Sequence, residues 1–331
     1  MKSKLATYEA YGEKKHDYKL STEEKRRALR QEGTSYEETL KINDYKDKIF
    51  SFNTMKTYQN EVSHYATWLE SKGMKKCSWE EAKEQIQTYI DEIAMTKSAW
   101  SVHTSLAALC KTFEVGMWEY KHPKRKLCNI KRGVHECVHD KRNEKNCKDI
   151  IEANRVLGLR RNELKHLKVS DVSEYEKDGR KIIKISYKGK GGKSCNNYYI
   201  DEHSQNFIRN LVAGRKPDEL VFIHCMEQFK WDLDIHSYRA EAARNMYQYI
   251  LEHEEEKGMF KELIEEEFQK RGKRLPKKLD GTYKLKGDNK RKHEEMGMET
   301  EVDRFAALAV SCLMLNHYRV SVSVNHYLLH L

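Results

Sequence analysis

The stretch KIIKISYKGKGGKSCNNYYI, residues 181–200, decides the fold class of this chain. Two runs rich in β-branched and aromatic residues flank the segment KGKGGK (188–193), which predicts a β-hairpin with a basic tip. The whole chain contains only three prolines and is rich in residues that favour helices. We therefore expect a mainly α-helical protein with a small β-hairpin or sheet, an α+β fold.

Upstream of the hairpin, apolar residues recur at helical spacing. In SFNTMKTYQNEVSHYATWLESKG (51–73) they fall on one face of an amphipathic helix. SWEEAKEQIQTYIDEIA (78–94) and SAWSVHTSLAALCKTFEVGMWEY (98–120) repeat this pattern, and each opens on a serine N-cap. KDIIEANRVLGLRRNELKHLKVSDV (148–172) predicts a helix, a glycine turn and a second helix.

The length of 331 residues favours two domains, because single hydrophobic cores seldom grow far beyond about 250 residues. Composition divides the chain into a charged N-terminal arm (1–46), a helical unit (47–121), a basic linker (122–146) and a second domain (147–331). Within the second domain, EHEEEKGMFKELIEEEF (252–268) predicts a solvent-exposed charged helix, in an insertion at about 251–300.

The charge balance favours a polyanionic partner, because 62 Lys and Arg against 52 Asp and Glu leave a net charge of +10. No apolar run is long enough for a membrane span, so we expect a cytoplasmic protein. Nucleic acid is the first candidate for the polyanionic partner, and binding to DNA would associate the protein with the nucleoid. The eight cysteines show no CxxC spacing and indicate free thiols. Cys128, His135, Cys137, His139 and Cys147 match no standard zinc finger, so we expect exposed linker residues and no metal.

Several residues in the second half could act together on a phosphodiester. They are Arg160 in GLRRNEL (158–164), the hairpin lysines, His236 and Arg239 in HSYR, and His317 and Tyr327 near the C-terminus. Planar guanidinium groups pair with the equatorial oxygens of a phosphoryl transition state, so two arginines can replace a metal ion. A lysine can protonate the leaving oxygen, and a tyrosine can act as nucleophile when cations surround it.

This order of residues resembles the tyrosine recombinase, or phage integrase, family. The matching motifs are GLRxxEL (158–164), the hairpin GKGGK (189–193), HxxR (236–239), and Leu-x-His followed by Tyr327. The helical unit, with NTMKTYQNEVSHYATWLE (53–70), is similar to the SAM-like core-binding domain of that family. The resemblance covers about residues 47–331 and implies a site-specific DNA recombinase or integrase of a mobile element that needs no cofactor.

The resemblance also implies roles for individual residues. Arg160 and Arg239 would clamp the scissile phosphate, and Lys190 would be the general acid, with Lys193 as the substitute. His236 would orient the phosphate or exchange the tyrosyl proton, while His317 would donate to a phosphate oxygen. Glu163 would brace the site, and Tyr327 would form a 3′-phosphotyrosyl link. Tyr318 directly follows His317 and is too close to converge on the same phosphate.

The implied partners are double-stranded recombination sites, a homo-oligomer of two to four subunits on DNA, and DNA-bending accessory proteins. Three features depart from the family. Asn316 stands where the family has glycine, 81 positions separate His236 from His317, and only four residues follow Tyr327, so subunits would have to link through another element. VSVSV (320–324) alternates like a strand, but the resemblance requires a helix or loop there, which we expect.

Three alternatives to a recombinase stay open: a related enzyme, a DNA-binding protein without activity, and a structural protein. A type IB topoisomerase would use related chemistry as a monomer, and a catalytically silent protein would bind DNA without cutting it. A helical scaffold that does not bind DNA is the third alternative, and it would lack salt-dependent DNA affinity.

Overall fold

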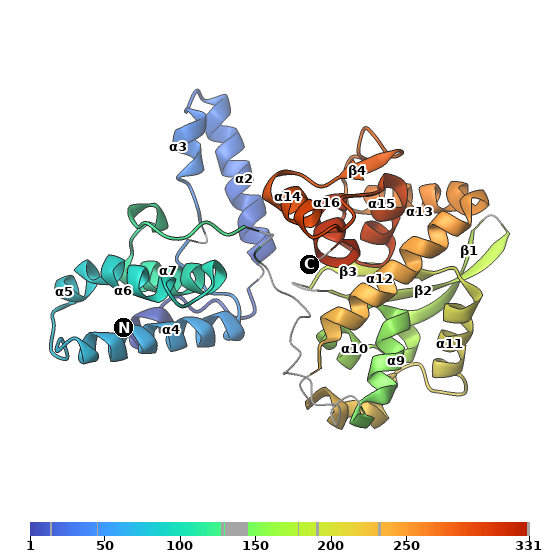
Figure 1. Cartoon of the computed structure of the whole chain (residues 1–331), viewed down its shortest axis with the longest axis horizontal. Coiled ribbons are helices and arrows are strands. Elements are labelled where there is room, and N and C mark those ends of the chain that lie inside the picture. The colour runs from blue at the N-terminus through green and yellow to red at the C-terminus, as the bar shows by residue number, and fades with distance from the viewer. Residues whose placement is uncertain are drawn as a thin grey trace. The chain divides into compact units, whose positions relative to one another are not determined.

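The computed structural model describes residues 1–13, 15–44, 46–126, 129, 145–177, 179–189, 192–230 and 233–329 (Figure 1). The chain forms two compact units, Met1–Arg125 and Lys126–Leu331. The described part is mainly helical with small antiparallel sheets, as the sequence predicts. No helix among the described residues combines the length and the apolar character needed to cross a bilayer.

The first unit is built on helices that share one apolar core. Helices α4 and α7 lie side by side, and α6 packs on α7 (Figure 1). Ser78 and Ser98 cap the helices that follow them, as predicted. The helices are α1 (Lys2–Ala6), α2 (Lys15–Gln31), α3 (Tyr36–Leu40), α4 (Phe52–Ser71), α5 (Trp79–Glu84), α6 (Ile86–Ala94), α7 (Ala99–Phe113) and the 3₁₀ turn η1 (Met117–Glu119).

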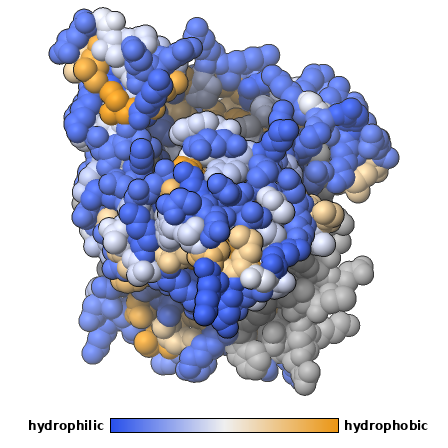
Figure 2. All heavy atoms as spheres, turned by 90° about the vertical axis from the view of Figure 1, so that its left-hand side faces the viewer, coloured by the Kyte–Doolittle hydropathy of each residue, from blue (hydrophilic) through white to orange (hydrophobic). Residues whose placement is uncertain are grey.

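The first 46 residues do not all form a separate arm. Leu5 and Tyr8 are buried in the core of the first unit, where α1 contacts α4 and α7. Helices α2 and α3 form a pair of their own, held by Arg26, whose guanidinium donates to the carbonyl oxygens of Leu40 and Ile42. The face shown in Figure 2 is mostly hydrophilic, and its apolar atoms gather in small separate patches.

The second unit contains the predicted hairpin, which belongs to a sheet with a third strand that we did not predict. Strands β2 (Arg180–Lys188) and β3 (Ser194–Tyr199) pair antiparallel, and β1 (Val172–Lys177) pairs with the other edge of β2. Strand β1 reads VSEYEK and is exposed at several positions, so its sequence lacks the apolar run that marks β2. Pairing with β2 therefore creates this strand.

Helices cover this sheet and carry the site residues. Helix α9 packs beside α12, and α15 contacts α12, α13 and β3 (Figure 1). Every residue of α15 from Phe305 onward is buried, which is typical of a central helix. The helices that bear on the site are α9 (Lys148–Leu157), α10 (Arg161–His166), α11 (Glu202–Val212), α12 (Ile235–Glu252), α13 (Lys257–Lys270), α15 (Arg304–Leu313), α16 (Val320–Ser323) and η6 (Val324–Leu328).

The remaining elements are short and lie between these helices. Strands β4 and β5 pair antiparallel and flank α14 along the chain. The elements are η3 (Val169–Asp171), η4 (Ile223–Lys230), η5 (Glu254–Glu256), β4 (Thr282–Lys284), α14 (Gly287–Glu295) and β5 (Glu301–Asp303).

The prediction of a solvent-exposed acidic helix at 252–268 was wrong. Helix α13 buries Phe260, Leu263 and Phe268 in the core of the second unit, and Glu267 on the same face is 2% exposed. The apolar residues of this stretch recur at helical spacing between the glutamates, and that periodicity outweighs the charge run. The region expected as an insertion is therefore part of the packed domain.

Candidate active site

Gly158 forms the turn that precedes the first residue of the candidate site, Arg160. It ends α9 with a left-handed φ of 57°, and a Cβ atom there would lie 3.2 Å from Ala242 Cβ and from Met314 Sδ. Glycine alone meets both conditions without strain. The tight turn makes Arg160 the N-cap residue of α10, so that its side chain leaves the helix at its first turn.

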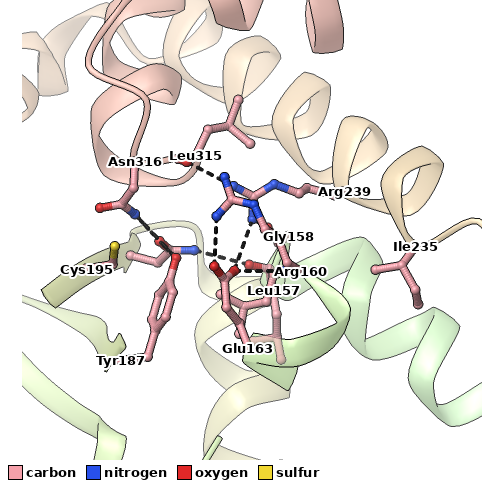
Figure 3. A network of polar contacts seen from close by, with 12 residues as sticks. Leu157, Gly158, Arg160, Glu163, Tyr187, Cys195, Ile235, Arg239, Leu315 and Asn316 are labelled. Atoms are coloured by element: carbon pink, nitrogen blue, oxygen red, sulfur yellow. Dashed lines mark hydrogen bonds and ion pairs between the residues drawn. The ribbon is translucent and has the colours of Figure 1, made fainter. Parts of the chain in front are cut away.

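Glu163 lies between the two arginines of the motifs. Its carboxylate accepts hydrogen bonds from the backbone N and Nη1 of Arg160, both at 2.8 Å. Oε2, which accepts from the Arg160 backbone N, also lies 3.7 Å from Arg239 Nη1, and the three charged groups converge in Figure 3. The Glu163 side chain is only 3% exposed, whereas that of Arg160 is 27% exposed and reachable by a ligand.

Arg239 is the largest fully buried side chain of the chain's described part. Its Nη2 donates to the carbonyl oxygen of Leu315 at 2.9 Å, and its Nη1 donates to that of Gly158 (Figure 3). Its Nε is buried and has no hydrogen-bond partner among the described residues. A buried cation with one N–H unsatisfied is costly unless a ligand completes its bonding.

His317 follows a turn that the sequence allowed. Asn316 adopts a left-handed φ of 56°, as expected for an asparagine in the position of glycine. Its side-chain amide donates to the carbonyl oxygen of Asn196 at 3.1 Å and to Oδ1 of Asn197 at 2.8 Å, which ties this turn to β3. The asparagine therefore adds a link that glycine could not provide.

The surroundings of His317 keep its imidazole neutral. Burial, followed by the positive charges of Arg239 and Arg160, lowers the pKa of His317 to about 3. Its Nε2 is buried and has no hydrogen-bond partner within the described ranges. A neutral imidazole in this position can donate or accept one hydrogen bond at that nitrogen, depending on its tautomer.

Tyr327 lies in the same cluster. The VSVSV segment is helical, as expected, and continues into the π-helical turn η6, which contains Tyr327. The Tyr327 ring is 4% exposed, with its centroid 5.6 Å from that of His317 and 5.9 Å from Arg239 Cζ. Its backbone carbonyl accepts from Arg244 Nη1 at 3.1 Å. π-Helical turns are rare and occur frequently at functional sites.

The hairpin tip begins beside this cluster. Gly189 lies so close to its neighbours that a Cβ atom would be 2.7 Å from Cys195 Sγ and 3.6 Å from Glu163 Oε1. Lys190, the expected general acid, lies outside the described residues. Lys193 is exposed, and its carbonyl oxygen accepts from Gly189 N at 2.8 Å.

Not every predicted residue belongs to the buried cluster. His236 precedes Arg239 by about one turn of α12, but its side chain is exposed. Of the linker residues considered for zinc, Cys128, His135, Cys137 and His139 lie outside the described residues. The described contacts bring together Arg160, Glu163, Arg239, His317 and Tyr327.

A second polar network supports the site and was not predicted. The buried carboxylate of Glu267 accepts from Asn196 Nδ2, Tyr198 Oη and Tyr318 Oη, each at 2.8 Å. It thereby joins α13 to β3 and to the turn that carries His317. Glu267 stands in the run EEEF, and nothing in that run distinguishes it from the exposed glutamates beside it. Its spacing from Phe260 and Leu263, which places all three residues on one face of the helix, is the only sequence feature that could have indicated that Glu267 is buried.

The charges of the cluster suit a phosphodiester. Two guanidinium groups face one carboxylate and a neutral histidine, which leaves one net positive charge in a largely buried site. The unpartnered nitrogens of Arg239 and His317 lie in this same group. The arrangement can bind a singly charged oxyanion and place a phenol beside it.

Neither a protein-family model nor a curated protein matches the sequence. Among solved structures, a crystal structure of XerA recombinase is similar over 85% of this chain and 89% of that chain. The two sequences are 13% identical and the TM-score is 0.25. A similarity at this level carries no conclusion about function, which has to be argued from the site.

Proposed function

We propose that this protein is a DNA strand transferase of the tyrosine recombinase type. In this proposal Tyr327 attacks a backbone phosphate and forms a 3′-phosphotyrosyl intermediate, and Arg160 and Arg239 stabilise the charge on the phosphoryl oxygens. His317 bonds a phosphoryl oxygen through Nε2, and Glu163 holds both arginines in place. Lys190, or Lys193, protonates the leaving 5′ oxygen, and His236, in the first turn of α12, orients the phosphate or takes the proton that the Tyr327 hydroxyl loses.

The observation that carries the proposal is the pair of unpartnered nitrogens. Arg239 Nε and His317 Nε2 are both buried without a partner in the part of the chain described, and both side chains contact the Tyr327 ring. Buried polar atoms of this kind are uncommon in folded proteins, and ligand binding is one reason for which they persist. An oxyanion between them would satisfy both nitrogens next to the proposed nucleophile.

The wider features of the proposal follow from the same chemistry. The bond energy is conserved in the phosphotyrosine, so that no cofactor or metal enters the reaction scheme. Rejoining to a second strand requires two DNA sites, and we propose that two to four subunits assemble on them, with DNA-bending accessory proteins. An integrase of a mobile element acting in the cytoplasm on nucleoid DNA is the corresponding biological role.

Covalent capture on nicked DNA tests the proposal. The protein is incubated with nicked duplexes of random sequence, from which a cut strand diffuses away, and protein–DNA adducts are isolated on denaturing gels. We expect an adduct whose peptide mass places the nucleotide on Tyr327, and Tyr327→Phe should form none. Tight DNA binding without any adduct would instead identify a silent DNA-binding protein.

Relaxation of supercoiled plasmid distinguishes the remaining enzyme class. A topoisomerase would relax plasmid of any sequence as a monomer, whereas a recombinase should form its adduct at a defined sequence. Sequencing of the captured DNA therefore also gives the target site. Captured strands without a shared sequence, together with plasmid relaxation, would contradict the recombinase proposal.

A further inference from the structure

Two cations lie against a single tyrosine beside the candidate active site. After α13 ends, the chain places the Cζ atom of Arg271 4.2 Å from the centroid of the Tyr318 ring. Lys273 Nζ lies 5.2 Å from the same centroid. Cation–π contacts hold both charges at one place, next to His317 in the sequence.

Hydrogen bonds fix the position of Arg271. Its Nη2 donates to the carbonyl oxygen of Ser194 at 2.9 Å and to Asn316 Oδ1 at 3.3 Å. Its contacts therefore include the start of β3, where the hairpin tip ends, and the turn that leads to His317. The cationic segment is connected to two elements that carry proposed catalytic residues.

The charges of two further cations, Lys193 and Arg319, act on Lys273. The pKa of Lys273 is lowered by burial and then by the charges of Arg271, Lys193 and Arg319. We call Lys193, Arg271, Lys273 and Arg319 the cationic cluster. Within the described ranges no carboxylate forms an ion pair with any of the four.

The missing acidic partners distinguish this cluster from Lys177 and Arg180, two cations of the same unit. Lys177 pairs with Glu262 and Glu266, at 2.6 and 2.9 Å, and Arg180 pairs with Glu256. Like charges repel each other, so four cations gathered without a carboxylate destabilise the free protein. An anionic ligand would remove this repulsion.

We propose that the cationic cluster is a second phosphate-binding site, which holds the DNA backbone at a phosphate other than the one facing Tyr327. The inference rests on the proposed function, because its ligand is the same duplex. Arginine and lysine contacts to phosphate fix the register of a duplex without reading its bases. The segment after α13 would thus extend the DNA-binding surface beyond the scissile phosphate.

The test removes the charges of two side chains of the cluster, Lys273 and Arg319. Lys273 and Arg319 make no side-chain hydrogen bond in the described part of the chain, so the double variant Lys273→Gln/Arg319→Gln should fold. The control Lys216→Gln/Lys261→Gln removes the same charge from exposed positions elsewhere in the unit. Far-UV circular dichroism and thermal melting verify that each variant is folded.

The measurement is the salt dependence of duplex binding, followed by fluorescence anisotropy. We expect the slope of log K against log salt concentration to become shallower by about 2, at about 0.9 for each lost phosphate contact. The control should keep the wild-type slope. The charge-conserving variant Lys273→Arg/Arg319→Lys should also keep it, which separates charge from packing.

The outcomes separate this inference from the proposed function. Suppose that binding by Lys273→Gln/Arg319→Gln and by the control shows the same slope of log K against log salt concentration, while the wild-type protein forms adducts. The inference is then overturned and the proposed function stands. If the slope changes as expected but the wild-type protein forms no adduct, DNA binding at the cluster is supported and strand transfer is contradicted. Absence of DNA binding by the wild-type protein overturns both.

Discussion

Tyr318 and Tyr327 follow the same histidine within ten residues, and an arginine lies beside each ring, but among the described residues only Tyr318 binds a carboxylate. Both rings are buried, with 6% and 4% of their surface exposed. The Tyr318 hydroxyl donates to Glu267, and burial together with that carboxylate raises its pKa well above the usual range. The Tyr327 ring lies against Arg239 and His317.

The hydrogen-bond partner of a buried tyrosine hydroxyl, and not the residue type, therefore determines what chemistry that tyrosine can perform. A phenol bound to a buried carboxylate is held in its protonated form, because ionisation would place two negative charges side by side. Helix α13 supplies that carboxylate to Tyr318 and not to Tyr327. Each ring has an arginine beside it, but among the described residues no carboxylate binds the Tyr327 hydroxyl, and a phenolate formed there during attack would lie next to the positive charge of Arg239.

The largest expected effect comes from replacing each of the two tyrosines, one at a time, by phenylalanine. Tyr327→Phe should abolish adduct formation on nicked duplexes, a decrease of at least about 10⁴-fold, because no other nucleophile takes its place. Tyr318→Phe should keep adduct formation and lose about 1–3 kcal/mol of stability, since buried Glu267 loses one donor. Quantitative gels and urea unfolding measure the two effects. An adduct that persists in Tyr327→Phe and disappears in Tyr318→Phe would reverse the assignment.

The next effect distinguishes two neighbouring arginines. Arg160→Lys should slow adduct formation by about 10²- to 10³-fold, because lysine keeps the charge and loses the paired donors. Arg161 instead donates to the carbonyl oxygens of Phe229 and Leu233, both at 2.9 Å. Arg161→Lys should therefore lower stability with less than about a tenfold effect on the rate. Single-turnover kinetics at saturating protein compare the two, and equal rates would contradict the role of Arg160.

A third effect concerns stability and isolates the Glu267 network. Glu267→Gln should lower the free energy of unfolding by about 2–4 kcal/mol, because the amide replaces an acceptor oxygen by a donor among four donors, one of which is the ammonium group of Lys270. Glu262 forms one surface ion pair, with Lys177, and Glu262→Gln should cost less than about 1 kcal/mol. Urea unfolding measures both. Similar losses would show that the burial of Glu267 is not what stabilises this region.

The smallest effect is the pH dependence contributed by His317. Its folded pKa of about 3 lies below the ordinary value of 6.5, so the unfolded chain binds a proton that the folded chain does not. The contribution is fully present above about pH 6.5 and is lost as the pH falls toward about 3, by at most about 1.4 kcal/mol per pH unit before solvent screening. His317→Gln should flatten this part of the curve. Urea unfolding at pH 7 and pH 5 tests it, and identical pH dependence in both proteins would contradict a buried neutral His317.

Sequence patterns predicted the hairpin, the amphipathic helix within residues 51–73 and the serine N-caps at Ser78 and Ser98. These features depend on neighbours in the chain: strand propensity, helical periodicity and the capping of backbone N–H groups by a serine hydroxyl. Strand β1 was missed because its residues are exposed and only the pairing with β2 makes them a strand. The burial of α13 was missed because its charge run was weighed above its apolar spacing.

The candidate site also contains features that the sequence predicts and features that it does not. The motifs around Arg160, Arg239, His317 and Tyr327 could be identified from spacing and chemistry, together with the order in which they occur. The acceptors of Arg239, which are the carbonyl oxygens of Gly158 and Leu315, could not be identified, because every residue carries such an oxygen. The exposed position of His236 also became visible only when α12 was packed against α9.

The amino-acid sequence alone predicted the mainly helical fold from local propensity, and the order of its motifs, through their resemblance to a family, indicated the candidate nucleophile. Tertiary structure decided which charges meet. Glu163 and Glu267 are both glutamates on helices, and packing alone places one between two arginines and the other among four hydrogen-bond donors. Electrostatic environments depend on distances across the fold, and local patterns along the chain contain no record of those distances.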